Sequence, residues 1–564
     1  MSQLPAGWRV VSCALIALAF GLFATGFTGP LYAQTASDGD PQEPPERVTP
    51  QGVTGGVVIG DDGSSLEAAA DAGVLTGRPT VRPPRAAVRP EIDGRLDDAL
   101  WRDAVRITEF VQMRPLDGAP STEATEVYLA YDSTNIYLGF YAHYADPGIL
   151  RANRADRDRG ERDDTFTVYF DTFLDQQRAY VFFVNGYGVQ GDSILGPDHG
   201  FGNRAGGGQF AGGPLGDLSW DALFDTAGQL VEDGFTAEMA IPFKSLRYPQ
   251  RGDDTPHRWG LQIVRVIRGK DEVVVWSPVS RDVAGFLPQM GVLDGMQGLS
   301  TSRNIEILPT FTAVQFGALD DGTGDFVTDN SPEGGLNFKY GITSNLTTDF
   351  TLNPDFSQIE SDRPQIAVNQ RFALFFPELR PFFLEGAEIF EVTPLPFTVV
   401  HTRTIVDPLY GAKLTGKVGK TTVGVMYAND EAAGDLDDPL AAASGQSAQT
   451  FVGRIRYDLY SESHIGAIVT DREFLDSHSR LAGIDGNFRL GDTHTLAVRL
   501  MGTQHRDLDG VDTTGHLAGV FVRKSGRNLS YGLGSFMLSP DFETDVGFVR
   551  RTDQRAAAAN LTYR

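Results

Sequence analysis

Six acidic residues crowd the stretch between residues 156 and 171, where they could hold a metal ion. The candidate ligands are Asp163, Asp164 and Asp171. Carboxylate oxygens are the ligands that Ca²⁺ prefers, so the stretch predicts a calcium site. Its spacing is not that of an EF-hand loop, and four arginines are interleaved with the acids between residues 154 and 162. A loop held by salt bridges is therefore the alternative.

Three tryptophans could bind sugar. They are Trp220, Trp259 and Trp276. Stacking against a pyranose ring needs a flat, electron-rich aromatic face, which an indole supplies. Packing in a protein core is the alternative for Trp276 and the favoured interpretation for Trp220 and Trp259. Trp101 follows an Asp-Gly turn on a short amphipathic segment, so we expect it in the core.

Two parts of the chain resemble catalytic motifs, and neither fits the chemistry. Glu385 and Glu388 could be imagined as the two carboxylates of a glycosidase. They lie in a Pro- and Phe-rich turn that does not fix them across a sugar, so ion pairs with Arg371 or Arg380 are favoured. The segment 411–417 has the spacing of a phosphate-binding loop, but Val418 replaces the required Ser or Thr. The sequence therefore favours a protein without enzymatic activity.

The composition indicates an all-β protein. The chain has 564 residues, of which 41% are hydrophobic and 64 are glycine. Asn-Gly and Asp-Gly turns and short alternating segments favour strands over helices. A formal charge of −26 argues against nucleic acid as a partner, because phosphate binding needs basic patches. Cys13 is the only cysteine, so no internal disulfide is possible.

The N-terminal part of the chain predicts export. Residues 1–33 combine a basic residue, an apolar run and a small residue at a plausible cleavage point, which is typical of a signal peptide. Residues 34–86 are rich in Pro, Gly and Asp and predict a flexible linker. Residues 87–300 follow, with short strands and turns at regular spacing, and predict an antiparallel β-sandwich.

Residues 303–564 predict a β-barrel of the outer-membrane type. Segments of about ten residues alternate between apolar and polar, as expected for lipid outside and water inside. A soluble sandwich with one solvated face alternates in the same way and is the alternative. Aromatic residues at the strand ends favour the barrel; they are Tyr410, Tyr427, Tyr460 and Tyr531. The last segment ends without a terminal aromatic residue, so an incomplete barrel is one expectation.

A Phe-rich insertion interrupts this region at residues 353–390. It fits neither an amphipathic helix nor an alternating strand. We interpret it as a structural latch, held by aromatic anchors and by ion pairs that are tolerated only when each charge has a partner. The residues assigned to the latch are Phe375, Phe376, Phe382, Phe383, Arg380 and Glu385.

Two family resemblances rest on these motifs. Residues 92–101 (IDGRLDDALW), 163–171 (DDTFTVYFD) and 276–278 (WSP) resemble the carbohydrate-binding-module family 9 domains. That resemblance implies a β-sandwich, aromatic contacts to sugar and, in some members, calcium. Residues 353–386 resemble DUF5916, an outer-membrane family in which such a domain precedes a β-barrel of unknown function.

Together these features predict a non-enzymatic envelope protein in the outer membrane. Its sandwich would bind a glycan or polysaccharide, and its barrel would contact outer-membrane lipid. The alternatives are an O-glycosyl hydrolase acting in polysaccharide catabolism and a structural barrel without a glycan ligand. Calcium is the one cofactor that the sequence suggests.

Overall fold

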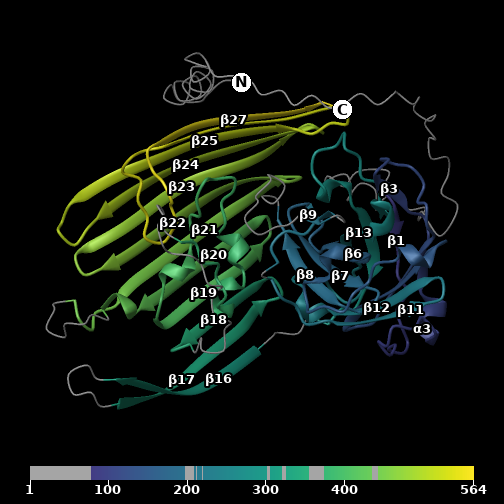
Figure 1. Ribbon diagram of the computed structural model, residues 1–564, viewed down its shortest axis with the longest axis horizontal. Helices are drawn as coiled ribbons and strands as arrows, with labels where there is room; N and C mark the ends of the chain where they lie inside the picture. The colour runs from purple at the N-terminus through teal and green to yellow at the C-terminus, as the bar shows by residue number, and fades with distance from the viewer. Residues whose placement is uncertain are drawn as a thin grey trace. The chain divides into compact units, whose positions relative to one another are not determined.

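The computed structural model describes residues 78–196, 209–210, 213–218, 220–300, 305–319, 326–354, 374–434 and 443–563. The predicted signal peptide and most of the predicted linker lie outside these ranges. Strands dominate the regular secondary structure of the described residues, as the composition indicated (Figure 1). Within them, no helix has the length and apolar character needed to cross a membrane.

Residues 78–300 form a β-sandwich of two main sheets. The first sheet has the order β11 (Asp225–Val231), β12 (Gly234–Pro242), β5 (Asn135–His143), β4 (Thr125–Tyr131) and β2 (Val105–Ile107). The second has the order β1 (Thr80–Val81), β15 (Gly291–Met296), β13 (His257–Ile267), β6 (Thr165–Asp171), β7 (Ala179–Asn185) and β8 (Gln190–Leu195). Beside β13, β14 (Glu272–Val275) pairs with β3 (Val111–Arg114). The pairing is antiparallel except between β1 and β15.

The core of the sandwich lies between the two sheets. Successive side chains of a strand point to opposite faces, so alternate residues of each sheet meet there. Phe140 of the first sheet stacks on Phe166 of the second, with ring centroids 4.7 Å apart. Every residue of β6 and β7 is buried, because a second apolar cluster covers the other face of that sheet. These strands are therefore apolar almost throughout.

The motif at residues 92–101 packs on the outer face of the first sheet. Its last residues begin the short helix α3 (Ala99–Asp103). Trp101 is buried, as expected, and its Nε1 donates to Glu238 Oε1 at 2.7 Å. Gly139 lies directly below, where an added Cβ would come within 2.7 Å of Leu96 and 3.1 Å of Trp101. The motif thus covers one end of this face and leaves the other end open.

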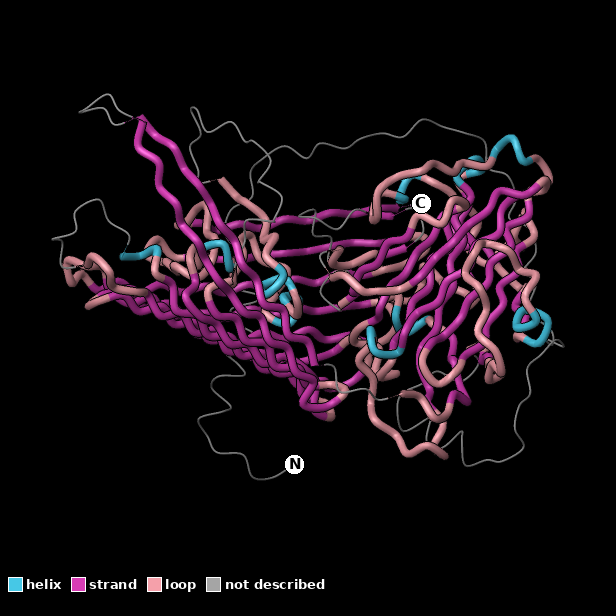
Figure 2. The backbone as a smooth tube through the Cα atoms, turned by 90° about the horizontal axis from the view of Figure 1, so that it is seen from below, coloured by secondary structure: helices cyan, strands magenta, loops and turns pink. Residues whose placement is uncertain are grey.

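Residues 305–563 form a single antiparallel sheet of twelve strands in sequence order (Figures 1 and 2). The strands are β16 (Ile305–Leu319), β17 (Phe326–Thr343), β18 (Leu346–Leu352), β19 (Pro408–Val418), β20 (Thr421–Asp430), β21 (Ala448–Tyr460), β22 (Ser463–Phe474), β23 (Ser477–Leu490), β24 (His494–Arg506), β25 (Asp512–Lys524), β26 (Leu529–Leu538) and β27 (Gln554–Tyr563). Among the described residues, no pairing joins β27 to β16, so the sheet is open.

The exposed face of this sheet is apolar, and its inner face carries buried charged residues. This is the reverse of the polarity expected in a water-soluble protein. On β21, Phe451, Ile455 and Tyr457 are exposed, whereas Arg454 and Asp458 are buried. Other strands expose large apolar residues on the same face: Ile307, Phe311, Phe350, Ile465, Ile484, Val520, Leu533 and Leu561. The opposite, inner face buries the charged groups, including Asp485 and Arg499. The predicted alternation is confirmed, with the apolar side outward.

Two loops of the sheet fold back over its inner face. One follows β18 and is described from residue 374 to 407; the other joins β26 to β27 at residues 539–553. Their apolar residues pack against the inner-face residues Met426, Val452 and Ile468. A bridge between Thr398 and Phe548 connects the two loops. The inner face is therefore covered by the chain's own loops in this part.

The loops at the two ends of the sheet differ in length. At one end all connections are short, with 2, 2, 2, 3 and 4 residues at 344–345, 419–420, 461–462, 491–493 and 525–528. The other end carries the connections 320–325, 353–407, 431–447, 475–476, 507–511 and 539–553. The first residues of β16 pair with the last residues of β17, so the chain enters the sheet from the sandwich at the short-turn end.

Candidate functional site

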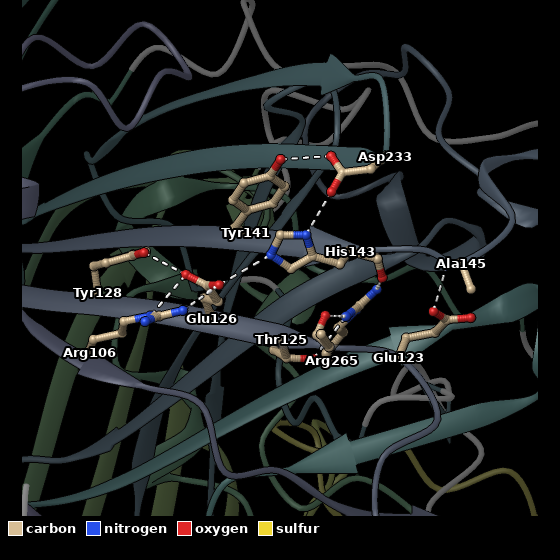
Figure 3. Close-up of polar contacts among 11 residues, drawn as sticks. Arg106, Glu123, Thr125, Glu126, Tyr128, Tyr141, His143, Ala145, Asp233 and Arg265 are labelled. Carbon is tan, nitrogen blue, oxygen red and sulfur yellow. Dashed lines mark hydrogen bonds and ion pairs between the residues drawn. The ribbon is translucent and has the colours of Figure 1, made fainter. Parts of the chain in front are cut away.

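A cluster of polar and aromatic side chains occupies the open end of the first sheet's outer face (Figure 3). Glu126 and Tyr128 come from β4, and Tyr141 and His143 from β5. The antiparallel register places Glu126 directly opposite Tyr141. Asp233 lies in the turn just before β12, which pairs with β5 on its other side. Five side chains from one sheet therefore meet on one surface, which we call the His143 cluster.

His143 lies between two carboxylates. Its Nδ1 is 2.8 Å from Asp233 Oδ2, and its Nε2 is 3.3 Å from Glu126 Oε1. Asp233 also accepts a hydrogen bond from the Tyr141 hydroxyl at 2.7 Å. Each group is thereby held in place by a neighbour, and the imidazole plane is fixed relative to the sheet.

A second network holds Glu126. It accepts from Tyr128 OH at 2.5 Å and from Arg106 Nε at 3.0 Å. Partial burial alone would raise the pKa of Glu126, but the hydrogen bonds from Arg106 and Tyr128 outweigh it and lower that pKa. The carboxylate of Glu126 therefore stays ionised and accepts hydrogen bonds at neutral pH.

Asp233 and Tyr141 shift one another's pKa in opposite directions. The hydrogen bond from Tyr141, followed by that from His143, lowers the pKa of Asp233. The same bond to Asp233, together with partial burial, raises the pKa of Tyr141 to about 12. At neutral pH the phenol therefore stays protonated and donates, and Asp233 stays an acceptor.

The cluster also offers a flat aromatic surface. The rings of Tyr141 and His143 are stacked, with centroids 3.8 Å apart and planes inclined by 23°. Both side chains are half-buried, so part of each ring faces solvent. A planar aromatic pair surrounded by fixed hydrogen-bonding groups is suited to a ligand with an apolar face and a hydroxylated rim.

Arg265 supports the cluster from below. Its guanidinium is fully buried, lies 4.7 Å from the centroid of the Tyr144 ring and donates to the main-chain oxygens of His143 at 2.7 Å and Ala124 at 2.6 Å. It therefore ties the end of β5 to the residue before β4. These charge-assisted bonds fix the strand ends that carry Glu126 and His143.

Two of the three predicted sugar-binding tryptophans are buried. Trp259 is 1% exposed and makes edge contacts with Phe170 and Phe243 in the core. Trp276 is 9% exposed and lies against Gly291. The prediction is corrected for Trp259, because an indole enclosed by core side chains cannot stack on a sugar.

Trp220 is half-buried. Its ring centroid lies 5.0 Å from that of Tyr180 and 5.8 Å from that of Phe182. Of the three tryptophans it is the one with a partly accessible ring, and its role in binding stays a prediction.

The predicted calcium ligands do not converge. Asp163 and Asp164 precede β6 and Asp171 ends it, so a whole strand of about 20 Å separates them. Asp163 accepts from Asn153 and Asn185, and Asp164 accepts from Tyr144 and from main-chain N–H groups. One ion cannot bridge all three carboxylates, which corrects the predicted ligand set. Calcium binding itself stays a prediction.

The residues assigned to the latch lie on the inner face of the twelve-stranded sheet. Phe383 is buried there in α4 (Pro381–Leu384). Arg380 donates to Glu378 at 2.8 Å and to the main-chain oxygens of Thr402 and Ile405 at 2.7 and 2.6 Å. Glu385 pairs with Lys339 at 2.5 Å.

The remaining latch residues are less buried. The Phe375 ring stacks on His401 with centroids 4.9 Å apart. Phe382 packs its edge on Phe383 and lies beside Lys413 Nζ, 5.0 Å from its ring centroid. Phe376 is half-buried. The role of these residues as a latch stays a prediction.

Sequence reasoning missed the His143 cluster. The segment 135–143 (NIYLGFYAH) predicts a strand, but the strand pattern alone does not identify its outward residues as a site. Alternation puts Tyr137, Gly139, Tyr141 and His143 on one face. Two aromatic residues and a histidine on the solvent side of a strand were the available signal. Asp233, about ninety residues away in the chain, could be added only from the fold.

The fold and the cluster define an all-β protein in which a sandwich with a polar-aromatic surface site precedes an antiparallel sheet with an apolar outer face. Residues 309–399 match the family DUF5916, a domain of unknown function. The resemblance to that family is confirmed over this segment. A search of curated proteins gave no match.

Solved structures with similar folds fall into two groups. A carbohydrate-binding module of family 9 from Caldicellulosiruptor kristjanssonii, in complex with cellotriose, is 13% identical; the match covers 39% of this chain and 95% of that one, with a TM-score of 0.27. OmpT, an outer-membrane protein of Vibrio cholerae, is 11% identical over 46% of this chain and 96% of that one, with a TM-score of 0.22. Salmonella typhi OmpF in complex with daunomycin is 8% identical over 81% and 95%, with a TM-score of 0.25.

Proposed function

We propose that the protein is a non-enzymatic outer-membrane protein whose sandwich binds carbohydrate at the His143 cluster. The observation that carries this proposal is the reversed polarity of the twelve-stranded sheet, joined in one chain to a sandwich with an aromatic, hydrogen-bonding surface. The first feature concerns where the protein resides, and the second concerns what it binds.

The outer face of the sheet supports a lipid environment. Phe311 is 78% exposed, and exposed large apolar residues recur on the same face of the other strands. In water, each such side chain would forgo about 1.5–3 kcal/mol of burial free energy. A contiguous apolar surface of this extent marks a surface that meets lipid or another protein. With buried charges on the other face, the pattern is that of a transmembrane β-sheet.

The His143 cluster supports a sugar as the ligand. A pyranose has one face of C–H groups that packs on an aromatic ring, and hydroxyl groups at its rim that need both donors and acceptors. Tyr141 and His143 offer the ring surface, and Glu126 and Asp233 offer the acceptors. Arg106, which is exposed, offers donors.

The hydrolase alternative gains no support from the Glu385 and Glu388 pair. Glu385 pairs with Lys339 at 2.5 Å, and Glu388 lies 3.4 Å from the Arg178 guanidinium. Both carboxylates are thus engaged in ion pairs with cations. We therefore propose binding without catalysis.

The loop lengths support a direction of insertion. Bacterial outer-membrane barrels have short turns on the periplasmic side and longer loops outside. The chain passes from the sandwich into the sheet at the short-turn end, and residues 301–304 can span no more than about 14 Å. We therefore propose that the sandwich lies on the periplasmic side, where its ligand would be a glycan of the envelope.

Isothermal titration calorimetry on the full chain in detergent tests the binding proposal. The ligands are soluble β-linked oligosaccharides, cellotriose among them. We expect Tyr141→Ala to weaken binding by about tenfold, because losing a stacked ring costs roughly 1–1.5 kcal/mol. Leu223→Ala is the control, since Leu223 is an exposed apolar side chain outside the cluster. Equal affinity in both variants would mean that the sugar binds outside the His143 cluster. The absence of heat with every sugar would refute carbohydrate binding.

A further inference from the structure

Three side chains with metal-ligating atoms meet at the long-loop end of the twelve-stranded sheet. His505 lies near the end of β24, and Glu543 and Asp545 lie in the loop between β26 and β27. One ligand atom from each comes within 4.8 Å of the other two. His505 Nδ1 is 3.5 Å from Glu543 Oε2, and its Nε2 is 3.5 Å from Asp545 Oδ1.

The loop is fixed on both sides of the two carboxylates. Phe542 and Val546 are buried in the apolar clusters on the inner face. The main-chain N–H of His401 donates to the oxygen of Val546 at 2.7 Å. An added Cβ on Gly515 would lie 2.3 Å from the Cα of Phe542, so only glycine lets the loop approach the sheet this closely. The positions of Glu543 and Asp545 are therefore set by packing.

The orientation of Asp545 is set as well. Its main-chain N–H donates to Ser479 Oγ at 3.0 Å. One carboxylate oxygen faces Arg472 NH1 at 3.7 Å, and the other faces His505. The second carboxylate oxygen is therefore directed toward the imidazole.

Three threonines adjacent to these residues in the chain or across a strand pair have buried hydroxyl oxygens. Thr503 and Thr544 are only 6% and 8% exposed, and among the described residues neither hydroxyl oxygen has a hydrogen-bond partner. Thr503 lies two residues before His505 on the same face of β24, and Thr544 lies between Glu543 and Asp545. The hydroxyl of Thr513, whose residue is paired with His505 across the strands, also has no partner. Buried polar groups in native proteins are satisfied by protein, by water or by an ion's hydration shell.

We propose that His505, Glu543 and Asp545 bind a divalent first-row transition-metal ion. An imidazole nitrogen with two carboxylate oxygens is a donor set suited to Zn²⁺ or Mn²⁺, whereas Ca²⁺ takes oxygen ligands. In a tetrahedral zinc site with ligand distances of about 2.1 Å, ligand atoms lie about 3.4 Å apart. The three atoms lie within 4.8 Å of one another, so side-chain rotations would have to draw them closer around the ion. Three protein ligands leave further coordination positions for water.

The bound ion would join the loop at residues 539–553 to β24. It would replace the two weaker contacts that the histidine makes with the carboxylates. The alternative is that His505 pairs with the two carboxylates and no ion is bound. The two cases differ in whether the protein binds a metal.

Calorimetric titration of the full chain in detergent with Zn²⁺ distinguishes them, with metal content measured after dialysis. We expect one equivalent of zinc, and a Kd weakened by at least about tenfold in His505→Ala, Glu543→Gln and Asp545→Asn, since even second-shell changes cost 10–100-fold. The control is His494→Ala, at the other end of β24, where the ring contacts Thr493 and Tyr531. Retained heat-modifiable mobility on gels shows that each variant is folded.

Two results would overturn the proposal. One is a wild-type chain that binds no zinc at 100-fold molar excess. The other is zinc binding that is unchanged in all three folded variants or is lost equally in His494→Ala. Neither result bears on the proposed binding of carbohydrate, because that surface lies on the sandwich.

Discussion

Glu238 lies on β12 beneath the turn formed by residues 93 and 94. Three N–H groups donate to its carboxylate: those of Asp93 at 2.8 Å, Gly94 at 2.7 Å and the Trp101 indole at 2.7 Å. The side chain is fully buried. One carboxylate therefore fastens the whole motif at residues 92–101 to the sheet. This explains why the motif combines an Asp-Gly turn with a tryptophan a few residues later.

We predict that Glu238→Ala destabilises the sandwich by about 2–4 kcal/mol, because three buried donors lose their acceptor. Thermal unfolding followed by tryptophan fluorescence measures the effect. Glu232→Ala, an exposed acid in the turn just before β12, should leave the melting temperature nearly unchanged. A similar melting temperature in Glu238→Ala and the wild type would mean that the motif is held by apolar packing alone.

At the scale of single elements, β21 carries different types of residue on its two faces. Its outward residues are apolar or aromatic, and its inward residues include Arg454, which forms a bidentate pair with Asp485. The same strand thus places a buried ion pair on one face and Ile455, which is exposed, on the other. In a soluble sandwich these two sets would exchange places.

We predict that Ile455→Lys destabilises the sheet in lipid vesicles by about 2–4 kcal/mol, the cost of a cation near the middle of the lipid face. Denaturant titration of the chain folded into vesicles measures it. Leu230→Lys, on the exposed edge strand β11 of the sandwich, is the matched control and should have little effect. If both substitutions were neutral, the outer face of β21 would not contact lipid.

At the scale of the whole molecule, the lengths of the loops and the entry point of the chain underlie the proposed direction of insertion. The five connections at one end have at most four residues. The connections at the other end include three of 15 or more residues, at 353–407, 431–447 and 539–553. The zinc site proposed above lies at this second end, opposite the end where the sandwich joins.

We predict that single cysteines report this topology. Cys13 is the only native cysteine, so a Cys13→Ser background carries none. A membrane-impermeant maleimide should label Asp509→Cys, in an exposed long-end loop, on intact cells. Leu223→Cys, exposed on the sandwich, should be labelled only after the outer membrane is permeabilised. Labelling of Leu223→Cys on intact cells would reverse the proposed direction.

Local periodicity determined much of this protein. The all-β class and the set of residues that share the apolar face of each strand follow from alternation with a period of two residues, which is a property of the chain itself. Trp101 is predicted in the core because it follows an Asp-Gly turn on a short amphipathic segment, and it is buried. These features depend on neighbours within a few positions, so a sequence shows them directly.

Only the tertiary structure decided which side chains meet. Trp259 and Asp171 have the residue types that sugar and calcium sites use, yet Trp259 is enclosed by the core and a full strand separates Asp171 from Asp163. Conversely, strand pairing brings Asp233 into contact with His143, and a loop that folds back over the sheet brings Glu543 close to His505. Contacts between distant segments depend on register and on how loops close, and no local pattern encodes them.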